Sequence, residues 1–266
     1  MSILTIGIDI GSRTVKAVIF DAETKAIRSS LRGDTTADPR KASQDLYERL
    51  LREAGVSARD VSATVATGYS REQFPFADRR YTEIACHAAG VHFFFPGGRT
   101  IIDIGGQDSK VIRTSQGSVS DFAMNDRCAA GTGRFLEVVE RILEIPLSSM
   151  EEVAQSSDNP CEISSMCVVF AESEIVSLLA QGRSRSDILA GVAKSLAHRI
   201  FSLSSKTGTQ EPLVFTGGVA RNGAVTRALM NIFKMEIFVP ENPFITGALG
   251  AALLAARMAG EKSATS

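Results

Sequence analysis

The sequence has no excess of charge of either sign, because 29 Lys and Arg residues stand against 30 Asp and Glu residues. A chain without a net basic field does not attract nucleic acid or an anionic membrane surface, so we expect neither as a partner. No apolar run is long enough to cross a membrane, and no basic segment or cleavage-site pattern precedes the strand-like ILTIGIDI near the first residue. These absences predict a cytoplasmic protein.

Cysteine, histidine and the common nucleotide-binding motifs are scarce or missing. Four Cys residues are too few for a disulfide framework, no Cys-x-x-Cys pair indicates a redox dithiol, and the three His residues lack the spacing of zinc ligands. The sequence contains no G-x-x-x-x-G-K-[ST] stretch, and AGTG at residues 130–133 is not a G-x-G-x-x-G turn. P-loop and Rossmann nucleotide sites are therefore excluded.

The chain does contain short β-rich runs that alternate with helical patterns, which predicts an α/β fold, and its 44% hydrophobic content can fill a sizeable core. One helix is expected to begin at Asp38-Pro39, with Pro at its first position, and to end at Gly55. Another, rich in Gly and Ala, is expected at about residues 246–258. Such a composition lets another backbone approach the helix closely.

Three glycine turns follow apolar strands. In the first, GIDIGSRTVK, the strand ends at Asp9, the turn contains Gly11 and Ser12, and Lys16 lies on the next strand. Backbone amides in such a turn can face a phosphate, and the carboxylate can order a hydrated Mg²⁺ ion. A single Asp-x-Gly turn also occurs in ordinary hairpins, but Asp9-Ile-Gly-Ser returns as Asp103-Ile-Gly-Gly. The repeat predicts two related lobes.

The second turn is DIGGQDSK at residues 103–110, and the third is FTGGVARN at residues 215–222, which opens a helix. The candidate nucleotide-binding residues of these two turns are Gly105, Gly106, Gln107, Gly217, Gly218 and Asn222.

Two cysteines precede amphipathic helices: Cys128 in NDRCAAGTGRFLEVVERIL and Cys167 in SSMCVVFAESEIVSLLAQG. The amides and the dipole at a helix N-terminus favour a thiolate and stabilise an anionic cofactor. By position alone, the more usual role of a free cysteine is that of a small buried hydrophobic residue. Cys86, within TEIACHAAG, and Cys161, in the turn-like DNPCE, are expected to be structural.

The three turns, in this order, resemble the two phosphate motifs and the adenosine motif of the superfamily of actin, sugar kinases and heat-shock chaperone ATPases. TEIACHAAG and TGALGAAL resemble its two connecting helices, so the likeness covers nearly the whole chain. The resemblance implies a two-lobed actin-like ATPase of duplicated ribonuclease H-like lobes, with the nucleotide in the interlobe cleft. The first lobe is expected at residues 1–97 and 246–266, and the second, with the cysteines, at residues 98–245.

NDRCAAGTGRFLEVV and CVVFAESEI, together with DIGGQDSK and FTGGVARN, resemble the activator ATPases of 2-hydroxyacyl-CoA dehydratases and the related ATPase subunits of benzoyl-CoA reductase. In that family one 4Fe-4S cluster is shared by two protomers, each giving two cysteines that match Cys128 and Cys167. A cube needs four thiolates and one chain offers two at helix starts, which agrees with a symmetric homodimer. A heterodimer of two different subunits is the alternative.

The resemblance implies an ATPase that accepts an electron from ferredoxin or flavodoxin and passes it to a dehydratase or a related double-cubane-cluster reductase. Asp9 and Asp103 would organise Mg²⁺ and the attacking water, Lys16 would face the phosphates of ATP or ADP, and Gln107 would orient the water or a carboxylate. A small-molecule kinase of the superfamily is an alternative, although no segment resembles a sugar-binding insert. A chaperone would need a peptide-binding domain after Ser266.

Overall fold

In the computed structural model, which describes residues 3–164 and 167–264, the chain divides by its internal contacts into two compact units. Unit 1 contains Met1–Gly97, Thr114–Ser120 and Phe244–Ser266, and unit 2 contains Gly98–Arg113 and Asp121–Pro243. The described residues form two five-stranded sheets, and in each sheet some neighbouring strands run parallel and others antiparallel. No helix of the described part of the chain is long and apolar enough to span a membrane.

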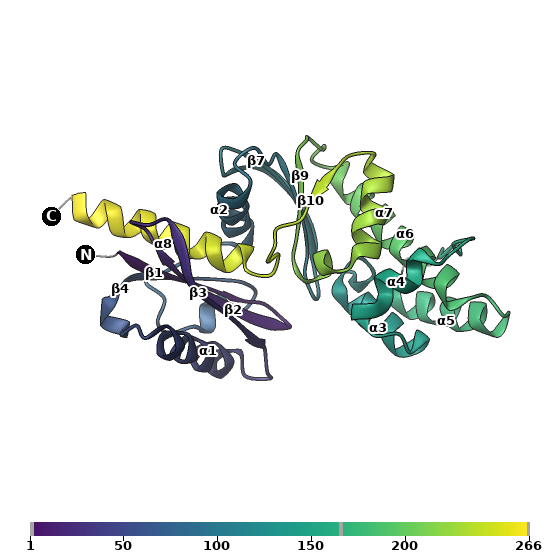
Figure 1. Cartoon of the computed structure of the whole chain (residues 1–266), viewed down its shortest axis with the longest axis horizontal. Coiled ribbons are helices and arrows are strands. Elements are labelled where there is room, and N and C mark those ends of the chain that lie inside the picture. The colour runs from purple at the N-terminus through teal and green to yellow at the C-terminus, as the bar shows by residue number, and fades with distance from the viewer. Residues whose placement is uncertain (1–2, 165–166, 265–266) are drawn as a thin grey trace. The chain divides into compact units, whose positions relative to one another are not determined.

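The sheet of unit 1 has the order β3-β2-β1-β4-β5. Its strands are β1 (Leu4–Ile10), β2 (Thr14–Asp21), β3 (Ala26–Asp34), β4 (Val61–Thr67) and β5 (Arg79–Arg80). β1 pairs antiparallel with β2 and parallel with β4. Figure 1 shows the helix α1 (Pro39–Ala54) against one face of this sheet and α8 (Thr246–Ala264) against the other, where α8 also contacts α2 (Glu83–Phe94).

Both ends of α1 have the predicted signals. The side chain of Asp38 accepts a hydrogen bond from the amide of Lys41, Pro39 occupies the first turn, and Gly55 ends the helix in the left-handed conformation with φ 64°. Tyr47 and Leu50 on the inner face of the helix are buried against the sheet. The sequence therefore predicted this helix correctly, from cap to cap.

Helix α8 packs backbone against backbone, as its Gly and Ala content predicted. A Cβ atom on Gly7 of β1 would collide with the carbonyl of Ala248, and a Cβ atom on Gly250 would collide with the carbonyl of Cys86 in α2. The helix consequently lies directly on β1 and α2. This close approach places its first turn beside the end of β1.

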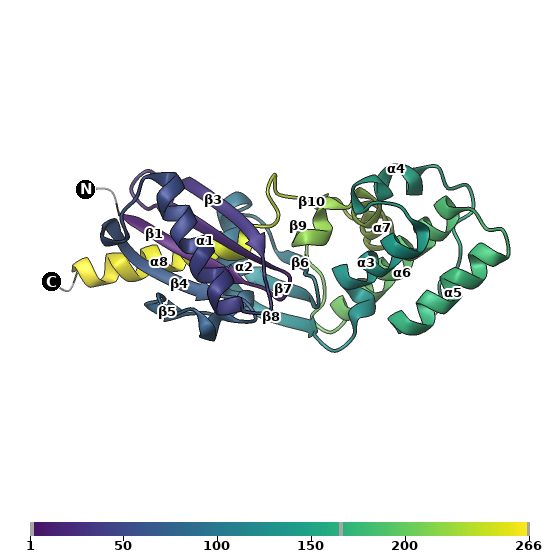
Figure 2. The same ribbon diagram turned by 90° about the horizontal axis from the view of Figure 1, so that it is seen from below.

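The second sheet, most of which lies in unit 2, has the order β10-β9-β6-β7-β8. Its strands are β6 (Thr100–Ile104), β7 (Ser109–Ser115), β8 (Ser118–Asn125), β9 (Leu213–Thr216) and β10 (Ile237–Phe238). Its helices are α3 (Gly133–Leu143), α4 (Met150–Gln155), α5 (Val168–Ala180), α6 (Arg185–Ser204) and α7 (Gly223–Phe233). Figure 2 shows α5 at the outer edge of this group of helices. One apolar core joins the helices to alternate residues of β6 and β9, such as Ile102, Ile104 and Phe215.

Candidate functional site

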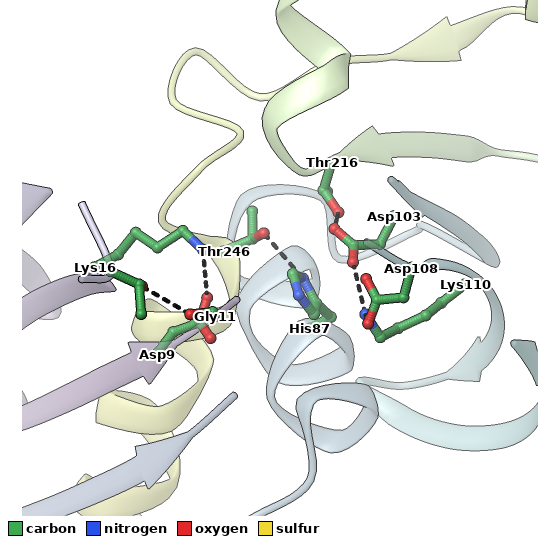
Figure 3. Close-up of polar contacts among 10 residues, drawn as sticks. Asp9, Gly11, Lys16, His87, Asp103, Asp108, Lys110, Thr216 and Thr246 are labelled. Atoms are coloured by element: carbon green, nitrogen blue, oxygen red, sulfur yellow. Dashed lines mark hydrogen bonds and ion pairs between the residues drawn. The ribbon is translucent and has the colours of Figure 1, made fainter. Parts of the chain in front are cut away.

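The first glycine turn of unit 1 contains an ion pair between neighbouring strands (Figure 3). Asp9 on β1 and Lys16 on β2 are register partners, and Nζ of Lys16 lies 3.0 Å from Oδ2 of Asp9. The amide of Gly11 donates to the carbonyl of Thr14 and closes the turn, while Ser12 is half-buried. The Lys16 side chain keeps 15% of its surface exposed, and its ammonium group contacts this one carboxylate.

The first turn of α8 borders the same carboxylate. A Cβ atom on Gly247 would lie 3.2 Å from Oδ2 of Asp9 and 3.3 Å from Nε2 of His87. Nδ1 of His87 lies 3.1 Å from Oγ1 of Thr246, and both side chains are buried. The sequence did not indicate His87 or Thr246 as part of this site, because nothing in their local sequence indicates a contact with β1.

The second glycine turn repeats the arrangement in unit 2. Asp103 and Lys110 are register partners, and Lys110 Nζ lies 3.4 Å from Asp103 Oδ2 and 2.8 Å from Asp108 Oδ2. Thr216 on β9 donates to Oδ1 of Asp103 at 3.0 Å. In both ion pairs the lysine lies seven residues after the aspartate. The sequence repeat therefore includes this lysine on the following strand as well as Asp-Ile-Gly. That spacing was a signal in the sequence for Lys110.

The two lysines nevertheless differ in environment. The Lys110 side chain is only 3% exposed and lies between two carboxylates, whereas Lys16 contacts a single one and is more exposed. Lys110 therefore holds the second turn together. Gln107, at the tip of the second turn, is exposed.

The third turn packs directly onto Asp103. Gly217 has φ 87°, and a Cβ atom there would lie 2.8 Å from Oδ1 of Asp103, so this position requires glycine. Oδ1 of Asn222 accepts hydrogen bonds from the amides of Ala224 and Val225, which makes Asn222 the N-terminal cap of α7. A cavity of about 350 Å³ borders the exposed side of this turn. It is lined by Glu151, Ala220, Arg221, Gly223, Thr226, Arg227, Met230, Val239 and Pro240.

The four cysteines fall into two classes. Cys86 and Cys161 are buried, and burial raises the pKa of Cys86 to about 12, which keeps its thiol protonated at neutral pH. Cys128 is partly exposed and Cys167 is exposed. Only the second class offers sulfur atoms to a ligand from outside the chain.

Cys128 and Cys167 were each expected just before a helix, and only Cys167 directly precedes one. Cys167 is the N-cap of α5, as predicted, and its side chain makes no capping hydrogen bond. Cys128 instead caps a single 3-10 turn, Ala129–Gly131, and α3 begins only at Gly133. The interruption arises because Thr132 is extended, with φ −136° and ψ 171°. No group of three or more His, Cys, Asp or Glu residues in the described segments could hold a metal ion.

The helix that follows Cys167 exposes three apolar side chains among polar ones such as Glu172 and Ser173. Val169, Phe170 and Val176 of α5 are 66%, 68% and 51% exposed, while Ala171 and Ile175 face the core. Isolated exposed hydrophobic side chains are normal, but three on one helix beside an exposed thiol indicate a contact surface.

Comparisons with known proteins agree with this geometry. The family model of the BadF/BadG/BcrA/BcrD ATPase family matches residues 6–255. An activator of lactoyl-CoA dehydratase from Anaerotignum propionicum is 45% identical, over 97% of this chain and 99% of its own. A benzoyl-CoA reductase subunit from Thauera aromatica is 34% identical, over 94% and 92%.

The solved structure of the activator of 2-hydroxyisocaproyl-CoA dehydratase from Clostridium difficile, with bound ADPNP, superimposes with a TM-score of 0.93. It is 42% identical, and the match covers 99% of this chain and 98% of that one. The two five-stranded sheets with their helices and this likeness confirm the α/β, two-lobed actin-like ATPase fold.

Proposed function

Since the chain belongs to the BadF/BadG/BcrA/BcrD ATPase family, we propose that it is an ATP-dependent one-electron donor that activates a 2-hydroxyacyl-CoA dehydratase. The electron donor in this proposal is ferredoxin or flavodoxin. A 4Fe-4S cluster shared by two identical protomers supplies the one-electron redox chemistry when bound. Cys128 and Cys167 of each protomer are its proposed ligands.

The accessibility of the thiols is the observation that carries the proposal. A shared cluster needs two thiolates from each chain that face outward, and the chain exposes two while burying the other two. Cys167 also caps α5 without using its sulfur, so the first amides of the helix can stabilise negative charge on the sulfur. The residues present therefore fit this cofactor.

The glycine turns supply the proposed nucleotide site. In this proposal Asp9 and Asp103, each near the end of a strand, order hydrated Mg²⁺ and the attacking water, and Lys16 is the cation that faces the phosphates. The cavity beside Arg221 is the proposed adenosine site. Gly105 and Gly106 contribute backbone groups next to the phosphates, and Gln107, exposed at the tip of the turn, orients the water.

Two alternatives remain as second candidates. The likeness to the benzoyl-CoA reductase of Thauera aromatica favours an ATPase subunit of such a reductase, which would pass its electron to a different enzyme. A small-molecule kinase of the same fold is the other, and it would need no iron.

The test is iron content after strictly anaerobic purification. We expect about four iron atoms per two chains, because a cube is held by four thiolates. Cys128→Ser and Cys167→Ser should each abolish iron binding, whereas Cys86→Ala and Cys161→Ala, which alter buried thiols, should retain it. Full iron in the Cys128 and Cys167 variants would refute the ligand assignment, and an iron-free wild-type protein with ATP-dependent transfer to a sugar or carboxylate would favour the kinase.

A second assay separates the partner enzymes. The iron-loaded protein should start ATP-dependent dehydration by a purified 2-hydroxyacyl-CoA dehydratase in the presence of a low-potential reductant. Activation of an aromatic acyl-CoA reductase alone would instead support the reductase alternative.

A further inference from the structure

The start of α3 is fastened to the second glycine turn by main-chain hydrogen bonds. The amide of Gly133 donates to the carbonyl of Gly105 at 2.9 Å, and the amide of Arg134 donates to the carbonyl of Gly106 at 2.9 Å. A helix leaves its first amides without partners inside the helix, and here two of them bind the turn that follows Asp103. Any shift of that turn must therefore move the start of α3 or break these bonds.

The same segment leads directly back to Cys128. Gly133 is five residues beyond Cys128, and the intervening chain is stiffened by the 3-10 turn and by a hydrogen bond from Oγ1 of Thr132 to the carbonyl of Ala129 at 2.7 Å. Gly131 is buried, and a Cβ atom there would lie 3.3 Å from Nδ2 of Asn125. The connection between turn and cysteine is thus short and closely packed.

Asn125 fixes the other end of the segment. Its Oδ1 accepts from the amide of Cys128 at 3.1 Å, and its Nδ2 donates to the carbonyl of Cys128 at 2.8 Å. One side chain therefore holds both polar groups of the Cys128 main chain at the end of β8. An amide side chain is needed for this, since a carboxylate can accept but cannot donate.

We infer that residues 125–134 form a direct link from the second phosphate turn to the Cys128 sulfur, in which Asn125 is the positioning residue for that sulfur. The link lies entirely within unit 2. A change in the turn on exchange of ADP for ATP passes through the Gly133 and Arg134 amides to Cys128, whereas Cys167, the N-cap of α5, is not one of the residues in this hydrogen-bonded path. The inference rests on the proposed function for the ligand of the turn and for the role of Cys128.

The test measures thiol reactivity in iron-free protein, so it does not depend on cluster assembly or on activity. Cys128 and Cys167 are alkylated with iodoacetamide in the presence of Mg²⁺ and either ADP or a non-hydrolysable ATP analogue, and the rate at each cysteine is followed by mass spectrometry. We expect the rate at Cys128 to differ severalfold between the two nucleotides in the wild-type protein.

Gly133 offers a matched pair of variants. Gly133→Pro removes the amide that donates to Gly105. Proline is tolerated at this position because Gly133 is the first residue of α3, and because the preceding Thr132 already has the extended conformation that a residue before proline prefers. Gly133→Ala adds a Cβ atom 3.1 Å from the Gly105 carbonyl but keeps the amide. The Cys128 difference should disappear in Gly133→Pro and persist in Gly133→Ala, with the Cys167 rates following the wild type in both.

Variants of Asn125 test the Cys128 end of the link and leave the residues of the second glycine turn unchanged. Asn125→Ala should abolish the nucleotide dependence at Cys128, and Asn125→Asp, which keeps the acceptor, should retain part of it. Nucleotide affinity is measured separately for every variant. If Gly133→Pro loses this affinity, the Asn125 variants alone decide whether the link controls the alkylation rate of Cys128.

The link is refuted if bound nucleotide leaves the Cys128 rate unchanged in the wild type, or if both Gly133→Pro and Asn125→Ala keep the full difference. A wild-type protein that binds no nucleotide at all contradicts the proposed ATP site itself. Failure of iron binding by Cys128 and Cys167 contradicts the proposed redox role and leaves the alkylation result intact.

Discussion

At the scale of single residues, the two lysines that follow the phosphate turns should behave differently when changed. Lys16→Met removes a partly exposed cation and should lower kcat for ATP hydrolysis by roughly a hundredfold, the typical effect of losing one donor to developing charge. Its effect on the free energy of unfolding should be small. Lys110→Met leaves two carboxylates without their buried cation and should lower the free energy of unfolding by about 3–5 kcal/mol.

Urea unfolding and steady-state hydrolysis, measured on both variants, separate the two roles. A Lys110→Met protein as stable as the wild type, or a Lys16→Met protein with unchanged hydrolysis, would contradict the assignment. The first result would remove the stabilising role from Lys110, and the second would remove the catalytic role from Lys16.

Motifs alone locate some of these residues but not their roles. Asp9 and Asp103 stand out because the same Asp-Ile-Gly follows two apolar strands. The burial of Lys110 depends on Asp108 folding over Gly105, and the cap made by Asn222 depends on where α7 begins. Such facts are set by packing, which a local motif does not encode.

At the scale of elements, the seam between α8 and α2 requires glycine. Gly250→Ala would place a methyl group on the carbonyl of Cys86 and should destabilise the protein by about 1–3 kcal/mol, the usual cost of overpacking. Gly260→Ala in the same helix is the matched control, because among the described residues no atom outside the helix's own backbone lies within 4 Å of its Cβ position. It should gain about 0.5–1 kcal/mol from the reduced freedom of the unfolded chain.

Equilibrium unfolding in urea measures both changes in one experiment. Equal effects of the two substitutions would show that α8 does not pack closely on α2. A gain in stability at Gly250 would do the same.

The elements with complete local signals are the ones that the sequence predicts well. Helix α1 has a capping Asp38, an initial Pro39 and a terminal Gly55, and α8 begins at Thr246 as expected. The motifs do not cover α6, although Ser184 caps it and its apolar residues recur at helical spacing. The break between Cys128 and α3 could not be foreseen, because it depends on the extended Thr132 and on amides bound to another turn.

At the scale of the whole molecule, the proposed four-thiolate site would take two chains, since each offers two accessible cysteines. The exposed Val169, Phe170 and Val176 of α5 are the apolar surface closest in sequence to Cys167, and burial against a second copy would remove them from water. Phe170→Glu should therefore shift iron-loaded protein from dimer to monomer in anaerobic sedimentation and reduce its iron content. Tyr69→Glu, at a side chain that is 78% exposed in unit 1, is the control and should leave both unchanged. A Phe170→Glu protein that stays dimeric with full iron would place the contact between protomers elsewhere, and equal loss in both variants would attribute the effect to added charge and not to α5.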